Sequence, residues 1–108
     1  MKLSELDPHW VIPNSWAKNA PPFYVGLSFM CPHCMTRRMS VRFYPPVDPD
    51  GLVGTMFEWT KTSGAQDGEL VWDRRGDTFE DITLDPSLNF AGKGHWHGHI
   101  INGEALTQ

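Results

Sequence analysis

Alternation of apolar and polar side chains is the clearest pattern in this chain, and it predicts β-strands. Between Met39 and Tyr44 every second residue is apolar, which is the period of a half-buried strand. The segment before it, 23–30, is a mostly apolar run of strand length that leads into Cys31. We expect the pair Pro45-Pro46 and the turn residues 48–51 to end the second strand.

Further along the chain the same reasoning predicts shorter strands. Segments 56–60 and 69–73 each carry an aromatic residue and are separated by a polar, glycine-rich stretch, which predicts a hairpin. After a turn at 74–77 we expect a strand over 78–84, stopped by Asp85-Pro86. The last strand is predicted over 95–101, followed by a short terminal strand over 104–106. The first 22 residues hold four prolines, so we expect them to be irregular, with a helical turn at 14–19.

Composition supports a mostly β protein with little helix. A chain of 108 residues that is 40% hydrophobic has enough apolar side chains for one domain with one core, spanning 1–108. Its 10 Gly, 9 Pro and 6 Phe favour short strands joined by turns over a helical bundle. The predicted fold is therefore a small antiparallel sheet or partial barrel.

Charge and hydropathy limit where the protein is expected to be located and what it is expected to bind. A net charge of −4 gives no overall attraction to nucleic acid or to an anionic membrane. No apolar run approaches the roughly 20 residues that span a bilayer. Glu5 and Asp7 interrupt the N-terminal segment, which therefore lacks the apolar core of a signal peptide. We expect a cytoplasmic protein that does not bind membranes.

The only two cysteines, Cys31 and Cys34, stand three apart in the sequence CPHC. Such a pair can form a disulfide, a redox centre or half of a metal site. A reducing cytoplasm disfavours a structural disulfide. A thioredoxin-like pair opens a helix in a βαβ unit, whereas strands are predicted on both sides of this one. A metal site is the third interpretation of the pair, and it requires further ligands from elsewhere in the chain.

The last predicted strand supplies further metal ligands. His95, His97 and His99 occupy alternate positions in GHWHGHI, so in a strand all three imidazoles project from one face. Two thiolates and two of these imidazoles would complete a tetrahedral zinc site. Such a site would crosslink the sheet between distant parts of the chain. Spacing alone leaves open which two histidines bind.

Two longer stretches resemble an uncharacterised family of bacterial and phage proteins. They are the segment 72–87, which ends in Leu84-Asp85-Pro86-Ser87, and the segment 95–104, which begins HWHGHI. Members of that family share a cysteine knuckle, an LxPS segment and a terminal CWHG or HWHG element, and the resemblance covers roughly residues 31–104.

The resemblance selects among the histidines. It implies that His95 stands where relatives often have cysteine and His97 where they have histidine, whereas His99 stands where relatives usually have an aromatic residue. One structural zinc held by Cys31, Cys34, His95 and His97 is therefore expected. The two remaining histidines, His9 and His33, are expected to be exposed to solvent.

An enzymatic function is the second interpretation. A zinc closed by four protein ligands is structural, and two thiolates weaken its Lewis acidity. Ser87 could instead act as a nucleophile, with His99 as its base and Asp85 orienting that base, although a serine after Asp-Pro is commonly a turn or cap residue. The resemblance adds that some relatives are encoded beside bacterial ubiquitin-like conjugation enzymes, which implies a peptidase acting on a protein.

A binding function is the third interpretation. Arg37, Arg38 and Arg42 follow the cysteine knuckle, and zinc knuckles with basic neighbours can hold single-stranded nucleic acid. The position of Arg38 and Arg42 on the polar side of a predicted strand argues against nucleic acid, and a protein partner stays open. The sequence thus favours a zinc-stabilised β domain whose role it does not specify, ahead of a serine hydrolase and an adaptor.

Overall fold

Seven strands follow one another around a single curled sheet that forms a half-barrel. The computed structural model describes residues 1–13, 23–55, 58–63, 69–90 and 95–107. A 3₁₀ helix, η1 (Leu3–Leu6), precedes the strands, which are β1 (His9–Val11), β2 (Tyr24–Met30), β3 (Arg38–Val47), β4 (Val71–Arg75), β5 (Thr83–Asn89), β6 (His97–Ile101) and β7 (Glu104–Thr107). No helix within these ranges has the length and apolar content needed to cross a membrane.

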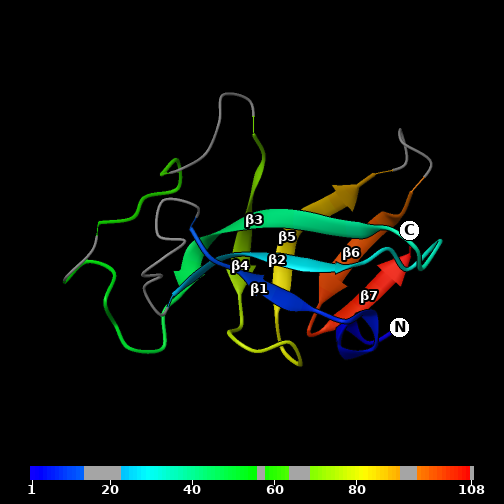
Figure 1. The fold of residues 1–108 in the computed structure, drawn as a ribbon, viewed down its shortest axis with the longest axis horizontal. Helices are drawn as coiled ribbons and strands as arrows, with labels where there is room; N and C mark the ends of the chain where they lie inside the picture. The colour runs from blue at the N-terminus through cyan, green and yellow to red at the C-terminus, as the bar shows by residue number, and fades with distance from the viewer. Residues whose placement is uncertain (14–22, 56–57, 64–68, 91–94, 108) are drawn as a thin grey trace.

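The sheet confirms the predicted mostly β fold, with one exception to its antiparallel pairing. Neighbouring strands pair antiparallel except β3 and β4, which run parallel with Arg42 opposite Val71. In Figure 1, β2 and β3 pass in front of β4 and β5 and cross them at a steep angle. Phe29, Phe43 and Trp96 are among the buried side chains that fill the space inside the curl.

Two strands run through prolines that were expected to end them. β3 continues through Pro45 and Pro46 and ends at Val47, just before the predicted turn at 48–51, while β5 contains Pro86. The prolines were therefore wrong as strand ends, whereas the turn after β3 is present. In each case the register with a neighbouring strand shifts around the proline: between Tyr24 and Gly26 where β2 pairs with β3, and between Leu84 and Leu88 where β5 pairs with β6. Such an irregularity removes the need for a ladder hydrogen bond from a residue that has no N–H.

The region between β3 and β5 differs from its predicted arrangement. The hairpin of 56–60 with 69–73 was wrong, because 58–60 form no strand and β4 pairs with β3 and β5; residues 56 and 57 lie outside the described ranges. The strand predicted over 78–84 was wrong for 78–82, where the amides of Asp81 and Ile82 donate to the Thr78 carbonyl and make a turn; its last two residues begin β5. A parallel pair requires a long connection, and residues 48–70 provide it.

Residues 1–13 join the two edges of the sheet, so the irregularity predicted for the N-terminal segment was wrong for η1 and β1. β1 pairs with β2 at one edge, while Lys2 forms a bridge with Glu104 of β7 at the other. The Leu3 amide donates to the Gly103 carbonyl at 2.7 Å, and the Leu3 side chain is fully buried. The helical turn predicted over 14–19 lies outside the described residues.

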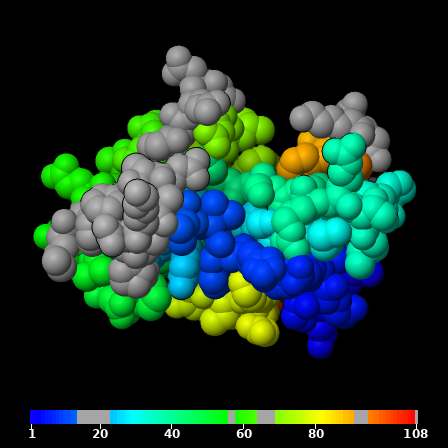
Figure 2. Space-filling view, in the orientation of Figure 1, coloured from blue at the N-terminus to red at the C-terminus, as the bar shows by residue number. Residues whose placement is uncertain are grey.

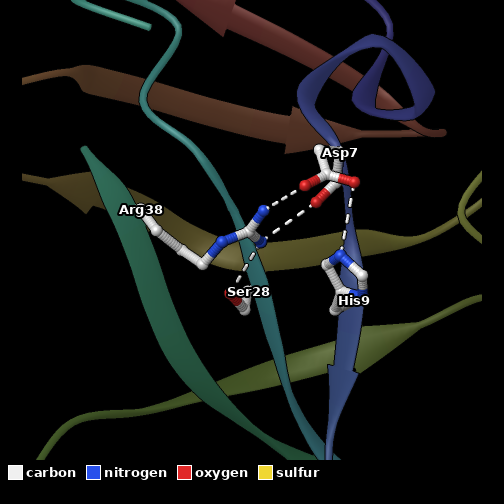
Figure 3. Close-up of polar contacts among 4 residues, drawn as sticks. All are labelled: Asp7, His9, Ser28 and Arg38. Atoms are coloured by element: carbon white, nitrogen blue, oxygen red, sulfur yellow. Dashed lines mark hydrogen bonds and ion pairs between the residues drawn. The ribbon is translucent and has the colours of Figure 1, made fainter. Parts of the chain in front are cut away.

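A polar network fixes this segment over the outer face of β2. Arg38 donates to the Asp7 carboxylate at 2.5 Å and to the Ser28 hydroxyl at 2.9 Å, and His9 lies 3.2 Å from the same carboxylate (Figure 3). Figure 2 shows the N-terminal residues, in blue, packed alongside β2 and β3. Ser28 is consequently buried although it faces outward.

Candidate metal centre

The first part of the site is the turn between β2 and β3, which positions both cysteines. The Cys31 amide donates to the Arg37 carbonyl at 2.7 Å, and the Met35 amide donates to the Cys31 carbonyl at 2.8 Å. Met35 adopts a left-handed backbone conformation with φ of 58°, which lets the chain reverse tightly after Cys34. These bonds close the turn around the two thiols.

The second part is His95, which lies just before β6. The His95 amide donates to the Phe90 carbonyl at 3.0 Å, and Phe90 donates in return to the carbonyl of Trp96. Trp96 is buried, packs edge-on against Phe29 and donates from its indole nitrogen to Thr107. The hydrogen bond to Phe90 and the buried Trp96 side chain hold the backbone at His95 in place.

The β2–β3 turn and the segment just before β6 meet at one end of the half-barrel, on the right of Figure 1. The Sγ atoms of Cys31 and Cys34 and one ring nitrogen of His95 all lie within 4.8 Å of one another. Cys34 Sγ is 3.8 Å from His95 Nδ1. A sulfur and a nitrogen bound to the same tetrahedral zinc would lie roughly 3.6 Å apart, given the usual bond lengths. The donor set and its spacing therefore suit a zinc ion.

The chemical state of the cysteines also suits a metal. Both are free thiols, Cys31 buried and Cys34 half-buried. Hydrogen bonds from the side chain and backbone of Thr36, with smaller contributions from Arg37 and Cys31, lower the pKa of Cys34 to about 6 despite the opposing effect of desolvation. Cys34 is then largely a thiolate at neutral pH, which is the form that binds metals.

The structure brings together three of the four predicted ligands, Cys31, Cys34 and His95. His97 does not belong to this group; it lies in β6, where it pairs with Asn89 of β5. His33, within the turn, and His9 are exposed, as predicted.

The predicted catalytic residues lie elsewhere on β5 and β6. Ser87 is inside β5, not at its end, and its carbonyl accepts a hydrogen bond from the Trp72 indole at 3.3 Å. Among the described residues, no hydrogen bond joins the Ser87 hydroxyl to a histidine. Asp85 forms an ion pair with Arg75 at 2.8 Å, and His99 pairs with Leu106 of β7. No contact among them assembles the predicted triad.

Sequence reasoning missed how far two arginines, Arg42 and Arg74, are covered by the rest of the protein. Arg42, expected on a solvated face, is largely covered: it donates to the Ser63 carbonyl at 2.6 Å and lies over the Trp59 ring. It also lines a cavity of about 520 Å³ together with apolar side chains of β1 and the segment before β4. Arg74 donates to the carbonyls of Pro45 and Pro46. Because the carbonyls that bind these two arginines are distant from them in sequence, no local sequence pattern predicted the contacts.

Comparison of the chain with protein-family models, curated proteins and solved structures finds no match. The resemblance carried by the knuckle and the terminal HWHG element therefore stays a prediction. What the fold and the site define is a half-barrel of seven strands with a Cys-Cys-His group that could hold a metal ion.

Proposed function

We propose that this protein is a zinc-binding β domain in which the metal joins the β2–β3 turn to the start of β6. The observation that supports it best is the convergence of Cys31, Cys34 and His95, whose ligand atoms lie within 4.8 Å of one another although His95 is 61 residues from Cys34 in the chain. Two free thiols and an imidazole at this spacing form a soft donor set, which favours zinc over magnesium or calcium.

Metal content of the purified protein tests the proposal. We expect close to one equivalent of zinc by inductively coupled plasma mass spectrometry after dialysis against zinc-free buffer. His95→Ala and Cys34→Ser should each retain far less, whereas His9→Ala, at an exposed histidine away from the site, should retain as much as the wild type. A folded wild-type protein that binds no zinc even when zinc is supplied would refute it.

A serine hydrolase acting on a protein substrate is the second candidate, supported by the register of β5 and β6. Leu88 pairs with Gly98 and both are buried, so Ser87 lies on the opposite, outer face of the sheet, which also carries His97 and His99. Neither histidine belongs to the three-donor group, so either imidazole keeps a lone pair that could accept the proton of the Ser87 hydroxyl.

A fluorophosphonate probe separates the two candidates. If Ser87 is a nucleophile, the zinc-loaded wild type is labelled and Ser87→Ala is not, while Ser40→Ala, at an exposed serine of β3, is labelled normally. Testing His97→Ala and His99→Ala separately then identifies the base. Absence of labelling in the folded, zinc-loaded wild type would exclude this hydrolase and leave the zinc-binding proposal intact.

A further inference from the structure

The three-donor group does not complete a tetrahedral zinc site. Within the described residues the group contains Cys31, Cys34 and His95 and no fourth donor. The segments outside those ranges contain only one residue of a ligand type, Asp67. Zinc in proteins takes four ligands when its role is purely structural, and three plus an exchangeable one when it binds substrate or water.

Two further histidines lie near the group in sequence, and neither belongs to it. His97 follows His95 by two residues, but it pairs with Asn89 of β5, and the next residue, Gly98, pairs with β7. The backbone of β6 is thus fixed on both sides at this point. His33 is in the cysteine turn itself, where its side chain is exposed and outside the three-donor group.

The solvent side of the group is also accessible. Cys31 is buried, whereas Cys34 and His95 are half-buried and the neighbouring Met35 is exposed. A metal held between these ligands would have the core behind Cys31 and solvent beyond the other two donors. Any fourth ligand would therefore approach from solvent.

We infer that the bound zinc keeps one coordination position for an exchangeable ligand from solution, a small anion or a thiol. This inference rests on the proposed zinc site. Two thiolates already neutralise the charge of the ion and reduce its ability to deprotonate water, so exchange of a soft ligand is the chemistry that this donor set favours. The Cys₂His set with an open fourth position is known from catalytic zinc sites.

Cobalt substitution tests the inference, because Co²⁺ reports its coordination through visible d–d bands. The metal-free full-length protein is loaded with Co²⁺ and titrated with azide and, separately, with thiocyanate. We expect both anions to shift the bands with saturation, and the spectra of His97→Gln and His33→Gln to match the wild type before and after addition. A thiolate-to-cobalt charge-transfer band in each sample would show that both variants still hold the metal.

Two results would overturn the inference, and they differ in meaning. Bands that do not respond to either anion, or that change in His97→Gln or His33→Gln without added anion, would mean that the protein closes the site with its own fourth ligand; the zinc-binding proposal would then stand. Failure of the folded wild type to bind Co²⁺ at all would overturn the metal site and this inference together.

Discussion

Removing one metal ligand should destabilise the whole sheet. In His95→Ala the metal can no longer connect the β2–β3 turn to the start of β6, so the folded protein loses this crosslink. The separation between Cys34 and His95 is 61 residues, and the chain-entropy relation for closing a loop of that length gives about 4 kcal/mol. This is a large share of the roughly 5–15 kcal/mol that stabilises a typical domain.

The expected effect is large enough to measure by thermal unfolding. For a domain of this size 1 kcal/mol corresponds to about 4–8 °C in Tm, so the zinc-loaded wild type should melt on the order of 20 °C above His95→Ala. Circular dichroism would follow the transition in four samples: each protein with zinc, and each with a chelator. We expect the chelator to lower the Tm of the wild type to that of the variant and to leave the variant unchanged.

A matched control distinguishes crosslinking from simple loss of a histidine. His33→Ala removes an exposed imidazole from the cysteine turn itself, and its Tm should stay within a few degrees of the wild type, as expected for an exposed substitution of about 0.5 kcal/mol or less. The reasoning would be refuted if His95→Ala and the wild type melted together in zinc, or if the chelator lowered both by the same amount.

Three further predictions concern other parts of the structure. Gly98→Ala should cost about 3 kcal/mol in urea denaturation, because the added Cβ would lie 2.1 Å from the Leu106 carbonyl of β7; an unchanged midpoint would contradict this packing. Hydrogen bonds from Thr78 lower the pKa of Asp81, so its carboxylate stabilises the fold at neutral pH and ceases to do so as the pH falls through that lowered pKa. The Tm difference between the wild type and Asp81→Asn should accordingly shrink toward zero in acid, and a difference independent of pH would argue against it. In metal-free protein, alkylation of Cys34 by iodoacetamide should rise with a midpoint near its pKa of about 6, and bound zinc should suppress it; a midpoint near that of an ordinary thiol would show that the turn does not stabilise the thiolate.

The strands that depend on local pattern were predictable from the sequence. Alternating apolar residues identified β3, and the apolar run before Cys31 identified β2, because a strand with one face on a core must repeat every two residues. A short terminal strand was expected over 104–106, and β7 (Glu104–Thr107) confirms it. The two cysteines and the alternating histidines also predicted where the candidate metal centre lies, and Cys31, Cys34 and His95 converge there.

Only the tertiary structure decided what depends on pairing between distant segments. The parallel contact of β3 with β4 and the bridge between Lys2 and β7 leave no local trace, since each joins residues that are far apart in the chain. Prolines in β3 and β5 indicated strand ends, yet a shift of register with the neighbouring strand accommodates each of them. Local propensity was overridden there by the packing of the whole sheet.

Which histidine joins the two cysteines was also decided by the tertiary structure and not by the sequence pattern. Alternation placed His95, His97 and His99 on one face, and nothing in their spacing distinguished one imidazole from another. In the structure β6 begins at His97, where pairing with β5 fixes the backbone, whereas His95 precedes the strand and reaches the cysteine turn. The sequence shows which residues are of types that can bind a metal. Coordination also requires their ligand atoms to lie within a few ångströms of one another, and only the folding of the sheet brings them that close.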